Sequence, residues 1–289
     1  AARALVLAAA LPVLALALAG PSWDRDVEIR YTSGLDLYFV VDCSYSMLAK
    51  DIAPSREKAA TFLAMSLLKE LPGARAGLIA FAGGAFPVCP LTSDADIIKS
   101  LLAQLHPDVL NRQGTNFDAP LETLARMLAK TDSRRRAAVV FLSDGETFRE
   151  PSAAVLGELA KHPLEFVAVG VGTPEGAFVE DPRTRMAQFI RDKDGQMVRS
   201  RLEEKSLIAL SQSLGGRYYR LQTVGLASRQ ILEGTLKNRG GGTYSSQLRP
   251  KDQSGWFIGG GALLLSAFLF TGGARRRRPA APAAVLAAL

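Results

Sequence analysis

Three oxygen-bearing side chains stand at alternate positions in the short segment DCSYS, directly after an apolar stretch. They are the carboxylate of Asp42 and the hydroxyls of Ser44 and Ser46. Hard divalent cations prefer oxygen ligands, and Mg²⁺ also keeps several waters in an octahedral arrangement. The segment therefore indicates part of a divalent-metal site, although a turn or a helix cap is the simpler interpretation of the same residues.

Two later segments can supply further ligands to such a site. Thr115 lies in a Gly-Thr-Asn sequence before an expected helix and offers a third hydroxyl. Asp144 follows another apolar stretch, in the sequence SDGE. Ligands of open α/β sheets bind beyond the carboxyl ends of the strands, where the strand order reverses. If the strands that end near Asp42 and Asp144 are neighbours, both carboxylates face one cleft.

The elements that must position these residues are apolar strands alternating with helical patterns. This alternation indicates a mostly parallel sheet with helices on both faces, so the expected fold is a doubly wound α/β domain. Two prolines in AFPVCPL place residues 85–91 at a sheet edge. The expected strands are residues 35–41, 74–82, 85–91, 137–144, 164–172 and 216–221. The expected helices are residues 54–71, 117–130, 151–161 and 202–214, and one that is capped by Ser93 or Asp94 and ends at Leu105.

The composition favours a packed domain and gives little support to a nucleic-acid partner. Of the 289 residues, 48% are hydrophobic and 22% are charged, which is atypical of a wholly disordered chain. The formal net charge is +7, but the consecutive arginines at residues 275–278 supply four of the positive charges. No basic patch with interleaved aromatic residues accompanies them, so we expect no nucleic-acid binding.

Both ends of the chain are apolar, which predicts attachment to a membrane. Residues 256–273 carry no charge, are about long enough to cross a bilayer and precede the arginines, which fit a cytoplasmic stop. Residues 4–20 are shorter and rich in Ala. They form either a membrane helix or a signal peptide, since Ala17-Leu18-Ala19 resembles a cleavage site. Both alternatives place the middle of the chain away from the cytoplasm, on the periplasmic side in a bacterium.

These patterns divide the chain into five expected parts. They are an N-terminal transmembrane helix or signal anchor (residues 1–20), the α/β domain (33–222), a juxtamembrane helix with a Gly-rich linker (223–254), a C-terminal transmembrane helix (255–273) and a basic cytoplasmic tail (274–289).

The candidate ligands and their order resemble the metal-ion-dependent adhesion site (MIDAS) of von Willebrand factor A (VWA) domains. That motif is D-x-S-x-S, then a Thr, then an Asp, and Asp42, Ser44, Ser46, Thr115 and Asp144 match it one by one. The resemblance covers residues 35–221. It implies that the three hydroxyls bind Mg²⁺, or alternatively Mn²⁺, while the two carboxylates hold waters and neutralise charge. It also implies that an acidic side chain of a partner protein fills an open position on the ion.

Three longer segments are similar to the bacterial aerotolerance-associated Bat proteins, and to BatB in particular: SMLAKDIAPSREKA, GLIAFAGGAFPVCPLTSD and residues 192–221. This resemblance implies a domain that is anchored in the bacterial inner membrane and faces the periplasm. It also implies a complex with a BatA-like VWA protein, other Bat components and a MoxR-type AAA+ ATPase, linked to stress tolerance or protein maturation. The expected function is metal-dependent protein binding, not catalysis.

The alternative function is that of a hydrolase or a metal-transfer enzyme that uses the same ion. No nucleophile–base pair is evident, because His106 and His162 both precede prolines near expected helix ends and Glu146 is interpreted as part of a helix-start loop. The sequence Asp-Lys-Asp-Gly at residues 192–195 lacks the further ligands of a calcium loop, so we interpret it as a hairpin turn between residues 187–190 and 197–198.

The two cysteines are expected to be free thiols. Cys43 follows the first strand of the domain. If residues 85–91 run antiparallel, as in VWA folds, Cys89 lies at the opposite rim of the sheet, beyond the reach of a disulfide. We expect no ligand role for Cys43.

Overall fold

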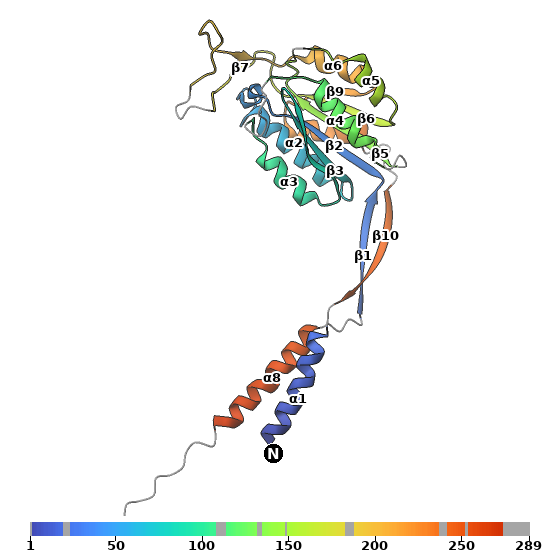
Figure 1. Cartoon of the computed structure of the whole chain (residues 1–289), viewed down its shortest axis with the longest axis vertical. Coiled ribbons are helices and arrows are strands. Elements are labelled where there is room, and N and C mark those ends of the chain that lie inside the picture. The colour runs from blue at the N-terminus through green and yellow to red at the C-terminus, as the bar shows by residue number, and fades with distance from the viewer. Residues whose placement is uncertain are drawn as a thin grey trace, which may run out of the picture. The chain divides into compact units, whose positions relative to one another are not determined.

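The computed structural model describes residues 2–19, 24–107, 114–131, 135–147, 149–182, 188–236, 242–251 and 254–273. The chain forms two compact units (Figure 1). The larger unit is Tyr31–Tyr244, and the smaller unit combines Ala1–Arg30 with Ser245–Leu289.

A six-stranded sheet with the order β4-β3-β2-β5-β6-β9 forms the centre of the larger unit. Within this sheet β4 alone is antiparallel to its neighbour, so the predicted mostly parallel fold and the edge position of β4 are confirmed. The strands are β2 (Leu35–Asp42), β3 (Arg75–Phe81), β4 (Ala85–Thr92), β5 (Arg136–Ser143), β6 (Leu164–Gly170) and β9 (Arg217–Arg220).

Helices cover both faces of this sheet. Because successive side chains of a strand point to opposite faces, β2 directs Phe39 and Val41 into one apolar cluster and Tyr38 and Val40 into the other. The first cluster is covered by α2 (Arg56–Glu70), α3 (Ala95–Gln104) and α7 (Val224–Ile231). The second is covered by α4 (Asp118–Leu128), α5 (Ala153–Leu159) and α6 (Glu204–Ser213).

Polar caps set the helix starts. The Ser55 hydroxyl accepts the N–H of Lys58, so α2 begins after Ser55 and not at Pro54 as predicted. Asp94, one of the two predicted caps of α3, accepts the N–H groups of Asp96 and Ile97. The predicted elements of the domain therefore exist, with ends displaced by one to a few residues.

The helix predicted at the start of residues 223–254 is present as α7, and part of the predicted linker is a strand. Ala227 and Ile231 of α7 are buried in the first apolar cluster, so this helix is part of the packed domain. The chain then forms a strand, β10 (Gly242–Lys251), which pairs with β1 (Asp24–Ser33). Neither strand was predicted.

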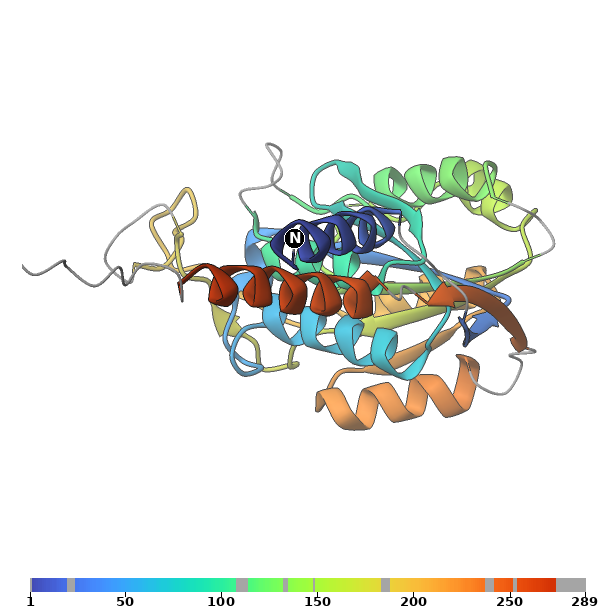
Figure 2. The ribbon, with the colours of Figure 1, turned by 90° about the horizontal axis from the view of Figure 1, so that it is seen from below.

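The smaller unit contains two helices, α1 (Ala2–Leu18) and α8 (Ser254–Gly273), together with most of β1 and β10. Figures 1 and 2 both show them side by side. In the part of the chain that the structure describes, no helix combines the length and the apolar character needed to cross a membrane. The predicted C-terminal span and the membrane-helix alternative for residues 4–20 are therefore not confirmed, and the predicted tail at residues 274–289 lies outside the described residues.

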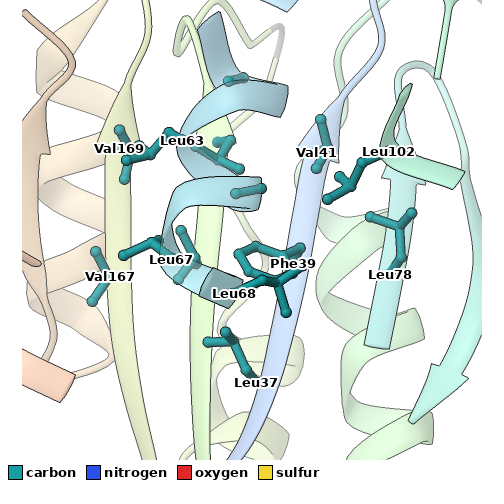
Figure 3. Close-up of a cluster of buried hydrophobic side chains, with 14 of the residues drawn as sticks. Leu37, Phe39, Val41, Leu63, Leu67, Leu68, Leu78, Leu102, Val167 and Val169 are labelled. Carbon is teal, nitrogen blue, oxygen red and sulfur yellow. The ribbon is translucent and has the colours of Figure 1, made fainter. Parts of the chain in front are cut away.

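The first apolar cluster is the part of the core on which the site's scaffold rests. Figure 3 shows Leu63 and Leu67 of α2 directed toward the sheet, near Val167 and Val169 of β6 and Phe39 of β2. All five side chains are fully buried. Helix α2 is thus fixed on the central strands that carry the candidate site at their ends.

Replacing Phe39 with Ala is expected to lower the free energy of unfolding by about 3–5 kcal/mol, because it leaves a cavity in a closely packed cluster. The matched change Phe62→Ala, on the outer face of α2 where Phe62 is 48% exposed, should alter it by about 0.5 kcal/mol or less. Urea unfolding followed by circular dichroism measures both. Equal losses in the two variants would contradict the central position of Phe39.

Candidate metal site

The predicted ligands lie where the strand order reverses. The chain builds β2, β3 and β4 toward one edge of the sheet and then β5, β6 and β9 toward the other, so β2 and β5 are neighbours at the switch point. Asp42 is the last residue of β2, and Asp144 directly follows β5. The parallel pairing therefore brings both carboxylates to the same end of the sheet, as expected.

Three hydroxyls face one cavity at this end. The loop after β2 turns into a short 3₁₀ helix, Tyr45–Leu48, and the Oγ atoms of Ser44 and Ser46 are hydrogen-bonded at 2.9 Å. The loop that carries Thr115 is joined to the end of β3 through the N–H of Asn116, which donates to the carbonyl of Ala82. Ser44, Ser46 and Thr115 all line a cavity of about 620 Å³.

The carboxylate of Asp42 lies behind these hydroxyls and has no exposed surface. Its Oδ1 accepts the N–H of Ser44 at 2.9 Å, and its Oδ2 accepts the hydroxyl of Ser143 at 2.7 Å. Burial and, to a smaller extent, the nearby charge of Asp144 together raise the pKa of Asp42 to about 7, although both hydrogen bonds oppose the shift.

A second buried carboxylate on the same strand, Asp36, has the cationic partners that Asp42 lacks among the described residues. At the other end of β2, Asp36 is fully buried but pairs with two guanidinium groups, at 2.6 Å from Arg75 Nη2 and 2.7 Å from Arg135 Nε. Among the described residues, no Lys, Arg or His side chain forms an ion pair with Asp42. An unbalanced buried carboxylate is unfavourable, so a cation at this end would stabilise the fold.

Asp144 is balanced by a buried arginine that was not predicted as a site residue. Arg56 Nη1 lies 3.0 Å from Asp144 Oδ2, and both side chains are fully buried. Burial raises the pKa of Asp144, while the charge of Arg56 lowers it. Arg56 is the first residue of α2, where the helix dipole disfavours a cation. That unfavourable position was the available sequence signal for a special role.

The residues present fit a divalent cation. Of the two buried carboxylates only Asp144 contacts a guanidinium, and three hydroxyls line the cavity beside them. Such an oxygen-rich set suits Mg²⁺ or Mn²⁺. In the part of the chain that the structure covers, no group of three or more His, Cys, Asp and Glu side chains gathers as a metal-binding cluster.

Comparison with known proteins identifies the fold. Residues 37–146 match the family of von Willebrand factor type A domains. The larger unit has a VWA-type α/β fold, and we call it the VWA domain.

Two solved structures resemble the chain over 71% of its length and over 100% of their own. They are an aerotolerance-related membrane protein from Bacteroides fragilis NCTC 9343, with a TM-score of 0.63, and BatB from Bacteroides thetaiotaomicron, with a TM-score of 0.62. Each is 28% identical to the chain. The resemblance to Bat proteins expected from the sequence is confirmed for the VWA domain.

Curated relatives share a shorter region. A UPF0353 protein of Mycobacterium sp. (strain KMS) is 32% identical over 147 residues, and one of Mycolicibacterium paratuberculosis is 33% identical over 147 residues. The match covers 50% of this chain and 43% of each relative. The chain therefore spans less than half the length of these curated relatives.

A long connection between β6 and α6 forms one wall of the cavity in the VWA domain. We call residues 173–203 the excursion. It contains β7 (Ala177–Phe178) and β8 (Arg199–Ser200), and it projects from the rest of the unit at β7 (Figure 1). The predicted hairpin is present in its described part, where Arg191 pairs with Met197. Its Asp192 Oδ1 accepts the N–H groups of Asp194 and Gln196, so that oxygen serves the turn.

Three cavity-lining residues near the end of this excursion were not predicted, namely Arg199, Arg201 and Glu203. They come from a segment with no metal-ligand pattern, and only the fold brings them to the site. Glu146 also lines the cavity, and its Oε1 accepts the N–H of Arg201 at 2.7 Å. Burial raises the pKa of Glu146.

Both cysteines of the VWA domain are buried free thiols, as predicted. Cys89 pairs with Leu78 in the middle of the β3–β4 ladder, whereas Cys43 follows the end of β2 and donates its N–H to Phe81. Two strand spacings and three residues along β3 therefore separate them, about 10 Å in each direction, which exceeds disulfide reach. Cys89 lies in mid-strand and not at the predicted opposite rim. Burial raises the pKa of the Cys43 thiol.

In the presence of a chelator, the stability of the domain should fall as the pH rises toward 7. The folded state raises the pKa of Asp42 from 3.8 to about 7, so folding favours the protonated carboxyl. This contribution is complete below about pH 4 and is lost as the pH rises through about 7, with a slope of at most about 1.4 kcal/mol per pH unit. Urea unfolding between pH 5 and 8 measures it.

The matched variant Asp42→Asn keeps the shape but cannot ionise, and it should lack this part of the slope. Added Mg²⁺ should remove most of the loss in the unaltered protein at pH 7.5, because the ion binds the ionised carboxyl state. Parallel curves for the two proteins in chelator would show that Asp42 titrates as an ordinary aspartate.

Gly145 is expected to be required for the loop that carries Asp144. Its φ is 79°, and an added Cβ would lie 2.2 Å from the carbonyl oxygen of Glu203. Gly145→Ala should lower the free energy of unfolding by about 1–3 kcal/mol and weaken binding of Mn²⁺. Gly157→Ala, in α5 with open space around the new Cβ, should instead raise stability by up to about 1 kcal/mol. Urea unfolding and Mn²⁺ titration of both variants test this, and an unperturbed Gly145→Ala protein would contradict it.

Proposed function

We propose that the VWA domain binds a partner protein through a divalent cation, Mg²⁺ or Mn²⁺, at the candidate site. Ser44, Ser46 and Thr115 would hold the ion at the cavity, with Asp42 and Asp144 behind them. The observation that carries the proposal is the buried carboxylate of Asp42, which lacks a cationic partner among the described residues and lies beside hydroxyls that line a cavity.

The arrangement suits recognition of an acidic side chain. When bound, the ion supplies a strong positive charge and a coordination position for an oxygen ligand. The hydroxyls are neutral, and Arg56 shares its charge between Asp51 and Asp144, so part of the ion's charge would stay available to an outside carboxylate. The cavity lies on the surface where such a side chain can reach it.

Binding without catalysis fits the side chains at the site. Neither histidine lines the cavity, and the Glu146 carboxylate that could act as a base accepts a backbone N–H of the excursion. We therefore propose a binding module and not a hydrolase or a metal-transfer enzyme.

We further propose that the protein works at the bacterial inner membrane, with the VWA domain in the periplasm. The similar protein of Bacteroides fragilis is a membrane protein related to aerotolerance. Apolar side chains of α1 and α8 are strongly exposed, among them Leu5 (71%), Trp256 (79%) and Phe270 (84%), and exposed apolar surface of this kind favours contact with lipid or protein. A BatA-like VWA protein, other Bat components and a MoxR-type AAA+ ATPase are the partners that the resemblance supports.

Replacing Ser44 with Ala should weaken Mn²⁺ binding by about tenfold or more, because one ligand of the ion is removed. Ser213→Ala is the matched control, since Ser213 is exposed and bonds only within α6. Calorimetric titration of the full chain in detergent measures both variants.

The same proteins, used as bait for solubilised bacterial membranes, test partner binding. Capture by the unaltered chain should require Mg²⁺ and disappear with chelator and with Ser44→Ala, while Ser213→Ala should capture normally. Capture that persists without the ion and without Ser44 would refute the metal as the docking point.

A further inference from the structure

The wall of the cavity that faces the candidate metal ligands carries two arginines, Arg199 and Arg201. They flank Ser200, and side chains alternate in direction along an extended segment. Ser200 is buried and turned toward Arg56, so its two neighbours are turned the other way and line the cavity. In the order Arg-Ser-Arg, the buried Ser200 thus attaches the segment to the domain, and an exposed arginine lies on each side of it.

Hydrogen bonds hold this wall in place at Ser200 and at the residues that follow it. Arg56 Nη1 donates to Ser200 Oγ at 2.6 Å, and Arg56 Nη2 donates to the Ser200 carbonyl at 3.1 Å. The N–H of Arg201 donates to Glu146, and the N–H of Glu203 donates to the carbonyl of Asp144 at 2.8 Å. The backbone that carries the two arginines is therefore held to the same residues that hold the metal site.

The guanidinium groups are available to a ligand. Arg199 lies over the ring of Phe178, with its Cζ 4.8 Å from the ring centroid, which orients the group without neutralising it. Among the described residues, neither Arg199 nor Arg201 forms an ion pair with Asp or Glu. Both side chains are exposed.

A bound metal would change the net charge of the cavity from about zero to positive. Glu146 and Glu203 also line it, so among the described lining residues the two arginines are matched by two carboxylates. A divalent cation adds two positive charges and makes the cavity attractive to anions as a whole. A ligand with one carboxylate at the metal would leave the arginines without a partner.

Resting on the proposed function, we infer that the cavity recognises a partner segment with two acidic side chains. One carboxylate binds at the metal, and the second pairs with Arg199 and Arg201. Guanidinium groups bind carboxylates in a bidentate, directional way, so the pair selects a doubly acidic segment over a single acidic residue. The excursion is thus the specificity-determining part of the site.

The test uses the full chain in detergent with Mg²⁺ and two capped, fluorescein-labelled peptides, tetraglutamate and a tetrapeptide with one Glu and three Ala. Fluorescence anisotropy measures their binding. The unaltered protein should bind tetraglutamate about tenfold more tightly than the single-Glu peptide, and Arg199→Gln with Arg201→Gln should remove this advantage. The same double variant should keep its affinity for Mn²⁺, because neither side chain is a ligand.

The control is Arg191→Gln with Lys193→Gln, which removes the same charge from exposed positions of the excursion outside the cavity. It should bind tetraglutamate like the unaltered protein. If Arg199→Gln with Arg201→Gln also does so, the inference is overturned while metal-dependent binding stands. If neither peptide binds the metal-loaded protein at all, the proposed function fails and the inference fails with it.

Discussion

The arrangement of the domain's functional end depends on two carboxylates buried beside each other at the end of an apolar sheet. Burial removes several kcal/mol of hydration from each ionised carboxylate, and a second like charge nearby makes the cost larger. One guanidinium, that of Arg56, cannot balance both. The remaining charge must be met by a proton or by a cation. The stability of the folded domain therefore depends on whether Asp42 is protonated or is ionised beside a cation.

Arg56 organises the loops around this pair. A guanidinium offers five N–H donors in one plane, and here they reach three separate segments. Arg56 holds Asp51 with two contacts of 2.8 Å, Asp144 with one, and Ser200 with two. Asp51 in turn accepts the N–H of Thr173, at the start of the excursion. One side chain therefore joins the end of β5, the loop before α2 and the cavity wall, which a lysine could not do with the same geometry.

The sequence was sufficient for the features that are local and insufficient for those that depend on the fold. The strands are apolar runs, and Asp42, Ser44 and Ser46 are close in sequence, so pattern and spacing predict them. The mostly parallel sheet could also be predicted, because strands and helices alternate along the chain. Ser200 and Arg201 carry no local pattern, and Arg56 carries only its unfavourable place at the start of a helix. These three residues meet only after the switch point has formed. The pairing of β1 with β10 is likewise a contact between distant segments, although Val27, Ile29 and Tyr31 alternate as in a strand.

Strand β2 shows how one sheet can separate structure from function. Asp36 and Asp42 are both fully buried on it, six residues apart, and both need a positive charge nearby. Asp36 receives that charge from Arg75 and Arg135, which are attached to the chain and cannot leave. Because these cations are part of the chain, Asp36 needs no exchangeable ion, and its ion pairs serve the fold. At Asp42 no attached cation of the described residues serves this role, and an exchangeable ion can. Under the proposed function, an ion held mainly by neutral hydroxyls would still attract an outside carboxylate, so the end of the strand without a fixed countercharge is the end where we propose that a partner binds.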